Sequence, residues 1–429
     1  MTSAPTPSER LRPELGLIGT IALGLGSIVG TGVFVSIGIG AGIAGPAVLV
    51  AIVIGALVAL CNGLSSAQLA ANHPLSGGTY QYGYEYASPT IGFTAGWMFL
   101  CAKSATAATA ALGLAGYLLN ALDQTASITP VALAAVLALT LISLLGINRT
   151  NKVNIAIVAA TLCSLIVFIV AGTPSALCNL YLTPLLGEQG WSALLHASAL
   201  MFVAYTGYGR IATLGEEVRQ PRKTIPRAIV AVLLISMMLY IGVGAVAIAA
   251  VGSEAFYAAT MDKAAPLKII AHTFDASGIS WLLALGAITA MAGVLLNLIL
   301  GLSRVLLAMG RRGDMPQALA RLNRDQTTPS IAVVVVGLAI SGLVLVGNIK
   351  TTWSFSAFTI LVYYAITNFC ALRLPADQRL YPRWIAIVGL VACLGLAFFV
   401  ERTIWLSGLG LLLLGWCWHR VAQYRMGKA

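Results

Sequence analysis

The residues most able to form a binding site are three glycines in one apolar stretch. Gly26, Gly30 and Gly32 lie in the sequence GSIVGTGVF (residues 26–34). Each interior glycine weakens a helix by roughly 1 kcal/mol relative to alanine, so a helix here can open. An opened turn presents free N–H groups that suit a carboxylate and free C=O groups that suit a cation or an ammonium. The stretch therefore predicts a binding site for a zwitterion such as an amino acid.

A second glycine pair, Gly207 and Gly209, interrupts a later apolar run in the sequence AYTGYG (residues 204–209). Opened backbone is tolerated at membrane depth only where it lines a cavity, so two interruptions indicate a buried site. The alternative is that Gly26 and Gly30 form a packing face of small residues. A dinucleotide-binding loop is excluded because the spacing is wrong and no βαβ unit follows. A potassium-channel filter is excluded because AYTGYG lies within a span rather than in a re-entrant loop.

Two basic residues, Lys103 and Arg210, fall inside apolar runs. An ionisable group at the bilayer centre costs at least ~2.5 kcal/mol unless it faces a cavity or a partner. Lys103 could bind a second carboxylate, replace a coupling cation or exchange a proton; the alternative is that it only snorkels or donates to backbone carbonyls. Arg210 could form a structural ion pair with Glu216 or Glu217, or act with Lys103 to select organic anions.

The acidic residues argue against several functions. All fourteen can be assigned to tails, loops or helix ends, which argues against cationic substrates and against a carboxylate proton relay. An embedded enzyme would need a nucleophile with a nearby base, yet no His, Asp or Glu is expected at mid-depth. The seven cysteines show no metal-binding spacing, so we expect no metal and no cofactor.

The elements that must position these residues are membrane-spanning helices. The 429-residue chain is 59% hydrophobic and only 9% charged, and its apolar runs of about 18 residues or more predict an all-α membrane protein with twelve transmembrane helices. The predicted spans are 16–43, 46–71, 89–121, 129–147, 153–172, 191–214, 226–252, 279–309, 330–347, 352–373, 383–400 and 403–419.

The distribution of basic residues predicts the orientation. Nineteen of the 25 Lys and Arg residues lie in the terminal tails and in the loops on one side, which accounts for the net charge of +11. Because cytoplasmic loops carry such an excess, both termini are expected in the cytoplasm of a multi-pass cell-membrane protein. The positive net charge is therefore explained by membrane topology, and we expect no nucleic-acid partner. No cleavable signal peptide is expected, since residues 1–13 are polar.

The two interrupted helices are the first and the sixth, five helices apart. Interrupted helices at matching places in two halves are typical of inverted-repeat transporters that bind their cargo at the midplane. The sequence thus predicts one transmembrane domain over 1–429, with repeat one (helices 1–5) at about 16–172 and repeat two (helices 6–10) at about 191–373. Helices 11 and 12, at about 383–419, are appended.

Several short motifs occur in an order that resembles the amino acid/polyamine/organocation (APC) transporter superfamily, and the match covers nearly the whole chain. The motifs are GSIVGTGVF, Pro74-x-Ser76-Gly77-Gly78-x-Tyr80, AYTGYG with Glu216-Glu217, Pro221 to Pro226, Ser303-Arg304, Arg311 to Pro316, Tyr363-Tyr364, and Ala371 to Leu374. The resemblance implies the LeuT-like fold of two inverted five-helix repeats.

The resemblance also implies roles for individual residues. The amides of Gly30 to Gly32 and the Thr31 hydroxyl would hold the substrate carboxylate, while carbonyls near Ile28 and in helix 6 would take its ammonium. The residues assigned to the pocket are Ile28, Gly30, Thr31, Gly32, Lys103, Ala107, Phe202, Val203, Ala204, Tyr205, Thr206, Gly207, Asn297, Leu298 and Ser356. Those assigned to coupling or gating are Lys103, Thr161, Tyr208 and Arg210.

Two positions depart from the family pattern. Val203, with Phe202 beside it, stands where many relatives place a large aromatic lid, and Thr161 stands where some carry a lysine in place of a coupling sodium. The predicted function is secondary transport of small neutral amino acids by alternating access, as a uniporter, an exchanger or a proton-linked symporter. The alternative is a carrier of acidic amino acids or organic anions that uses Lys103 and Arg210.

Overall fold

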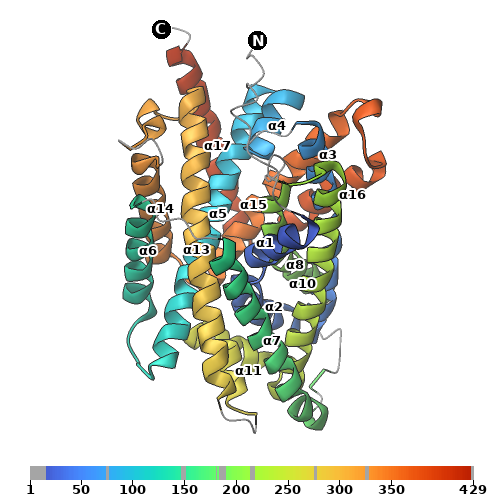
Figure 1. Cartoon of the computed structure of the whole chain (residues 1–429), viewed down its shortest axis with the longest axis vertical. Coiled ribbons are helices and arrows are strands. Elements are labelled where there is room, and N and C mark those ends of the chain that lie inside the picture. The colour runs from blue at the N-terminus through green and yellow to red at the C-terminus, as the bar shows by residue number, and fades with distance from the viewer. Residues whose placement is uncertain are drawn as a thin grey trace.

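The computed structural model describes residues 16–73, 77–145, 151–179, 181–182, 190–212, 218–274, 278–323 and 328–426. Over these ranges the regular elements are all helical, and the long helices run roughly along the longest axis of the molecule (Figure 1). Among the predicted features, Glu216 and Glu217, Pro74 and Ser76 lie outside the described residues.

The elements of the first half are α1 (Leu17–Ile28), η2 (Gly32–Ser36), α2 (Ile37–Ala44), η3 (Gly45–Ala47), α3 (Val48–Asn72), α4 (Thr79–Tyr86), α5 (Pro89–Ala121), α6 (Ile128–Leu144) and α7 (Asn151–Asn179). Those of the second half are α8 (Gly190–Tyr205), η4 (Thr206–Tyr208), α9 (Gly209–Ala212), α10 (Pro221–Val251), α11 (Ser253–Lys263), α12 (Pro266–Ala271), α13 (Ile279–Arg312), η5 (Gln317–Ala320), α14 (Ser330–Val346), α15 (Ile349–Arg373), η6 (Ala376–Gln378), α16 (Arg383–Ala397) and α17 (Arg402–Met426).

Local sequence sets the starts of the two central helices. Before α5, the Ser88 hydroxyl accepts a bond from the Ile91 amide at 3.3 Å, and proline occupies the first helical position. Before α15, Asn348 and Thr351 form a reciprocal capping box. Such caps satisfy amides that the first turn of a helix leaves without intrahelical partners.

Seven helices of the described chain are long and apolar enough to cross a membrane, and four shorter apolar helices accompany them. An integral membrane protein follows from this set, while the full count of twelve spans stays a prediction. Three boundaries were wrong: α7 runs to Asn179, beyond the predicted end at 172, despite Pro174 within it; α10 begins at Pro221, before the predicted start at 226; and α17 runs to Met426, beyond the predicted end at 419. The loops also contain the short helices α4 and α11, which lie at opposite ends of the molecule (Figure 1).

The core is built around α5 and α15, which pack against each other and are the most buried of the long helices. α5 is rich in alanine and small hydroxyl residues, so neighbouring backbones can approach closely. Apolar side chains on outer helices remain uncovered: Leu338 on α14 is 67% exposed and Val346 is 92% exposed. These side chains form the surface suited to lipid.

Candidate functional site

The first predicted break is an opening of the helix. α1 ends at Ile28, and Val29 has φ −79° and ψ 102°, which is extended backbone. The helical path resumes as the π-helix η2, whose first bonds are donated by the amides of Val33 and Phe34 to the Gly30 carbonyl, at 3.1 and 3.2 Å. The amides of Gly30, Thr31 and Gly32 therefore precede the first intrahelical donor, as at any helix start.

The three glycines of this stretch have different roles. Gly26 lies within α1, and a Cβ there would stand 2.7 Å from Cγ2 of Val158 on α7. For Gly26 the packing interpretation is correct, because the residue allows two helices to approach. Gly30 lies in the opening itself, and a Cβ there would meet Cγ2 of Val294 at 2.8 Å. The prediction of an opened helix is thus correct at Gly30 and wrong at Gly26.

The second break is tighter than the sequence suggested. α8 gives way to the single 3₁₀ turn η4 and then to α9, so the helix is overwound rather than opened. Gly207 in this turn faces the Ser27 carbonyl, and a Cβ there would also lie 2.8 Å from Cγ1 of Ile28. Glycine is needed here because η4 presses directly against the end of α1.

The two interrupted helices are joined by a residue that the sequence did not reveal. The hydroxyl of Tyr240, on α10, donates to the Ile28 carbonyl at 3.0 Å and lies 3.2 Å from the Ala204 carbonyl. These carbonyls belong to the two segments assigned to the substrate ammonium. A carbonyl oxygen has two lone pairs, so each can accept a second donor. In the sequence, Tyr240 is distinguished only by its hydroxyl group, which lies within an otherwise apolar run.

Thr31 has the character expected of a carboxylate ligand. Its side chain is buried, and its hydroxyl finds no hydrogen-bond partner among the described residues. A buried hydroxyl without a partner costs free energy unless something else satisfies it. Together with the amides beside it, which precede the first intrahelical donor, Thr31 offers donors of the type that a carboxylate accepts.

Lys103 reaches the second break. Its Nζ donates to Oγ1 of Thr206 at 2.8 Å, and that hydroxyl in turn donates to the Val203 carbonyl at 2.8 Å. The Tyr364 hydroxyl approaches the Thr206 carbonyl at 3.4 Å. Lys103 is only 8% exposed, so its amine is held at the interruption and does not reach the surface.

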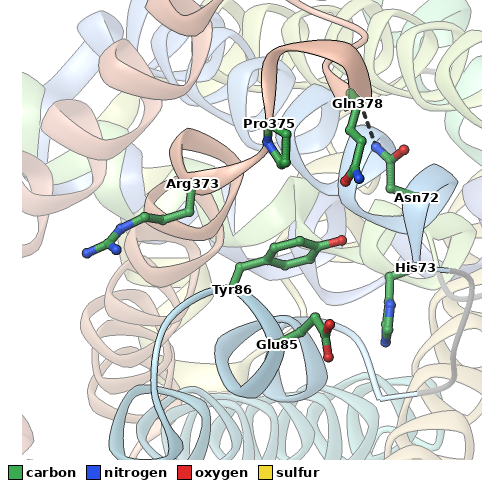
Figure 2. Close-up of a pocket in the computed structure, with 7 residues that line it drawn as sticks. All are labelled: Asn72, His73, Glu85, Tyr86, Arg373, Pro375 and Gln378. Atoms are coloured by element: carbon green, nitrogen blue, oxygen red, sulfur yellow. Dashed lines mark hydrogen bonds between the residues drawn. The ribbon is translucent and has the colours of Figure 1, made fainter.

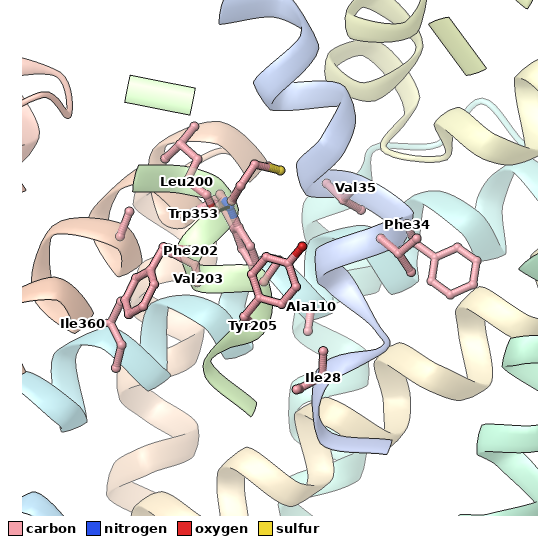
Figure 3. Packing of buried hydrophobic residues seen from close by; sticks show 14 of the residues in the cluster. Ile28, Phe34, Val35, Ala110, Leu200, Phe202, Val203, Tyr205, Trp353 and Ile360 are labelled. Atoms are coloured by element: carbon pink, nitrogen blue, oxygen red, sulfur yellow. Dashed lines mark hydrogen bonds between the residues drawn. The ribbon is translucent and has the colours of Figure 1, made fainter. Parts of the chain in front are cut away.

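Phe202, Val203 and Tyr205 come from the last turn of α8 and point in different directions, with Ile28 beyond them at the end of α1 (Figure 3). Val203 is buried beside this junction, whereas the Phe202 ring packs edge-on against Tyr364 with centroids 5.6 Å apart. The Tyr205 hydroxyl donates to the Ile52 carbonyl at 3.2 Å. The two aromatic side chains are thus committed to packing within the core.

Helices α5, α13 and α15 supply the other predicted pocket residues. Ser356 pairs with the hydroxyl of Thr106 at 2.7 Å, and Ala107 next to it is fully buried. On α13, Val294 is the residue that faces Gly30, while Asn297 and Leu298 are partly exposed one turn farther along.

The coupling and gating candidates are spread apart. Thr161 donates to the Ile157 carbonyl of its own helix at 2.8 Å, and the ring of Tyr208 packs against Tyr364 with centroids 5.4 Å apart. Arg210 is exposed on α9. Lys103 is therefore buried whereas Arg210 is exposed, so the two basic groups lie in different environments.

A profile of the family described as amino acid permease matches residues 19–426. This chain belongs to the amino acid permease family. The permease is accordingly a transporter and not an enzyme, and the APC resemblance is confirmed. Both interruptions lie within the matched region, so the site described above is part of the family domain.

Individual relatives support this membership. The permease is 38% identical over 410 residues to an uncharacterised transporter of Mycobacterium tuberculosis, covering 95% of this chain and 90% of that protein. It is 28% identical to a branched-chain amino acid permease of Bacillus subtilis, over 77% and 74% of the two chains. It is 27% identical to a mitochondrial cationic amino acid transporter of Arabidopsis thaliana, over 83% and 63%.

A polar cavity of 460 Å³ lies apart from the two breaks, where α3, α4 and the segment after α15 meet (Figure 2). It is lined by Asn72, His73, Glu85, Tyr86, Arg373, Pro375 and Gln378. The Asn72 amide donates to the Gln378 carbonyl across it at 2.7 Å, and the Arg373 side chain points away from the other residues. Within the described ranges, no group of His, Cys, Asp and Glu side chains is arranged to hold a metal ion.

Proposed function

We propose that this permease carries small neutral amino acids across the cell membrane by alternating access, with both termini in the cytoplasm. In this proposal, helices 1–5 and 6–10 form inverted repeats, and the substrate lies between the opened first helix and the turn in the sixth. The observation that carries the proposal is the opening after Ile28, which separates carbonyl acceptors at the end of α1 from amide donors at the start of η2.

The opposite charges of an amino acid fit this arrangement. Thr31 and the amides beside it would hold the carboxylate, with the positive end of the following helix favouring a negative group. The carbonyls of Ile28 and Ala204 would accept the ammonium, sharing with or displacing the Tyr240 hydroxyl. The substrate thereby links the two interrupted helices.

Packing around the opening favours a short side chain. Val294 lies so close to Gly30 that a Cβ there would be 2.8 Å from it, and Ile28 and Val203 add apolar surface. Among the described residues, no Asp or Glu lies within the seven long apolar helices. A cationic side chain would therefore lack the partner that its charge needs in the membrane.

An acidic substrate is the second candidate, because Lys103 is buried at the site and its amine, among the described residues, is bonded to the neutral hydroxyl of Thr206. A side-chain carboxylate could replace Thr206 as its partner. Arg210, exposed on α9, would not contribute to that binding.

Uptake competition in proteoliposomes tests the proposal. We expect unlabelled serine and alanine to compete with labelled alanine, and glutamate and lysine not to. Equal competition by glutamate would favour the second candidate. A thermal-shift panel gives an independent measure, since a ligand at 100 times its dissociation constant stabilises the folded state by about 2.7 kcal/mol. Absence of both binding and uptake for every amino acid would refute the function.

A further inference from the structure

Three arginines gather where α15 ends and α16 begins. Nε of Arg379 donates to the Leu374 carbonyl at 2.9 Å, and Nη2 of Arg383 donates to the Leu372 carbonyl at 3.5 Å. Arg373, the last residue of α15, lies between these two carbonyls in the chain. Because the bonded carbonyls are only two residues apart, the two guanidinium groups are held near each other at one helix end. We call Arg373, Arg379 and Arg383 the arginine cluster.

The charge of the arginine cluster is not neutralised within the described part of the chain. None of its members forms an ion pair there, although Asp377 lies in the same connection and is exposed. Arg373 is exposed, stacks over the Phe369 ring at 5.0 Å and points away from the polar cavity (Figure 2). A guanidinium has several N–H donors in a fork that matches a phosphate. Donors therefore remain for an anionic ligand.

From the arginine cluster, α16 continues with an apolar stripe on the outside of the molecule. Residues about four apart share one face of a helix, so Arg383 lies on the same face as Ile387 and Val391. Val391 is 64% exposed, and Trp384, at the start of the helix, is 60% exposed. The opposite face of α16 is buried. A guanidinium thus stands above an uncovered surface suited to an acyl chain.

The arginine cluster lies at the end of the molecule that the proposed topology places in the cytoplasm. The segment after α15 meets α4 at the polar cavity, and α4 lies at the same end as the last turns of α17 (Figure 1). The cytoplasmic leaflet is the one that carries anionic lipids. Trp384, exposed at the start of α16, is of the residue type enriched at the membrane interface.

We infer that the arginine cluster binds the phosphate of an anionic phospholipid, one acyl chain of which lies along the exposed face of α16. The positive charge above the stripe complements the headgroup, and the stripe itself requires an occupant with an apolar chain. Free phosphate or an acidic peptide would leave that stripe uncovered. The inference goes beyond the proposed function, because it does not depend on which amino acid the permease carries.

The start of α10 provides a comparison within the same molecule. Lys223 and Arg227 are exposed there, above the exposed side chains of Leu234 and Met238. Unlike Arg379 and Arg383, these two basic side chains form no hydrogen bond to the described residues, so each would lose more conformational freedom on binding a headgroup. General surface charge would attract lipid to both places, whereas a prearranged site favours the arginine cluster.

The test is native mass spectrometry of the full chain in detergent, which counts the lipids bound during a titration. Dioleoyl phosphatidylglycerol is the anionic lipid, dioleoyl phosphatidylcholine has the same chains with a neutral headgroup, and glycerol phosphate is the headgroup without chains. Arg383→Gln removes one charge of the cluster. Arg373→Gln removes another and leaves both bonds to the carbonyls of α15 intact, so it tests the site even if Arg383→Gln folds poorly. Arg227→Gln is the matched control on α10.

We expect wild type to bind phosphatidylglycerol at least about fivefold more tightly than phosphatidylcholine. Arg383→Gln and Arg373→Gln should each weaken phosphatidylglycerol binding about fivefold, the effect of one basic residue at an anionic surface, and Arg227→Gln should not. Equal affinity for the two lipids, or unchanged phosphatidylglycerol binding in both cluster variants, would overturn the inference. An equal loss in Arg227→Gln would overturn it by assigning the effect to general surface charge. Displacement of the lipid by equimolar glycerol phosphate would overturn it in favour of a free phosphate.

Discussion

At the scale of single residues, small differences of side chain decide what the opened backbone can hold. Gly30 and Gly26 are four residues apart, yet one lies in the opening and the other packs α1 against α7. Thr31 adds a buried hydroxyl with no partner among the described residues, and Lys103 adds a buried amine. The opened backbone, the Thr31 hydroxyl and the Lys103 amine therefore each restrict which substrates can bind.

Gly30→Leu should abolish substrate binding without preventing folding. A Cβ at this position would already be 2.8 Å from Val294, and the rest of the leucine would fill the space assigned to the carboxylate. The measurement is the thermal shift produced by alanine, together with uptake. Gly301→Leu on α13 is the control, because no atom lies within 4 Å of its Cβ position. Normal uptake by Gly30→Leu would refute this placement of the carboxylate.

Lys103→Ala should change the pH dependence or the substrate preference of uptake far more than Arg210→Ala does. Lys103 is buried at the break whereas Arg210 is exposed on α9, and only a group within the site can exchange a proton with the cargo in place. Uptake rates measured between about pH 5 and 8 compare the two variants. Identical pH profiles for wild type and Lys103→Ala would leave the lysine with a structural role.

At the scale of elements, contacts between helices hold the site together. Tyr240 of α10 links the end of α1 to α8, and Lys103 of α5 is bonded to the turn that follows α8. At the other end of α5, Tyr117 accepts from the Leu267 amide of α12 and donates to the Phe34 carbonyl of η2. The opened segment is thus held by helices from both halves of the chain.

Tyr240→Phe should loosen the contact between the two interrupted helices. The two carbonyls lose their hydroxyl donor, and an unsatisfied buried acceptor costs about 1–3 kcal/mol. We expect a lower unfolding temperature in detergent that alanine partly restores, since its ammonium can bond the same carbonyls. Tyr381→Phe, in the loop before α16, should leave both quantities unchanged. An unaltered unfolding temperature in Tyr240→Phe would show that the bridge contributes nothing.

A second set of contacts anchors α17. The buried carboxylate of Asp314 accepts from the hydroxyls of Tyr80 and Tyr84 on α4, at 2.6 and 2.7 Å. On α17, Nδ1 of His419 lies 3.5 Å from the same carboxylate, and the Trp418 indole donates to the Asp314 carbonyl at 2.9 Å. One acidic residue thereby joins α4, the end of α13 and α17.

Asp314→Ala should lower the free energy of unfolding by more than about 2 kcal/mol, because it removes the carboxylate acceptor from the buried Tyr80 hydroxyl and the half-buried Tyr84 hydroxyl. Chemical or thermal unfolding in detergent measures this, with the exposed Asp377→Ala as the control. Burial, followed by the bond to Asp314, raises the pKa of Tyr80 and of Tyr84 above the usual 10.0. The stabilisation linked to these raised pKa values should therefore be complete below pH 10 and be lost as the pH rises above it. Equal stability of Asp314→Ala and wild type would contradict the anchor.

At the scale of the whole molecule, the distribution of charge predicts how the chain sits in the membrane. Glu254, on α11, and Arg222, at the start of α10, are both exposed. In a background without the seven native cysteines, an impermeant maleimide should label Glu254→Cys in intact cells and Arg222→Cys only after permeabilisation. The reverse pattern would place the termini outside.

The sequence by itself determined the helical membrane class, the family and the presence of an opening at Gly30, because hydropathy and glycine content act locally along the chain. It did not distinguish an opened turn at Gly30 from the 3₁₀ turn at Gly207, since each outcome depends on what presses against the glycine.

Only the tertiary structure decided which distant groups meet. Tyr240 and Ile28, Lys103 and Thr206, and Thr106 and Ser356 come together through helix packing. Val294, rather than Asn297 or Leu298, faces Gly30 because the rotation of α13 about its axis sets which side chain points at the opening. Such rotations depend on the sum of many weak packing contacts across the core, and no short stretch of sequence encodes that sum.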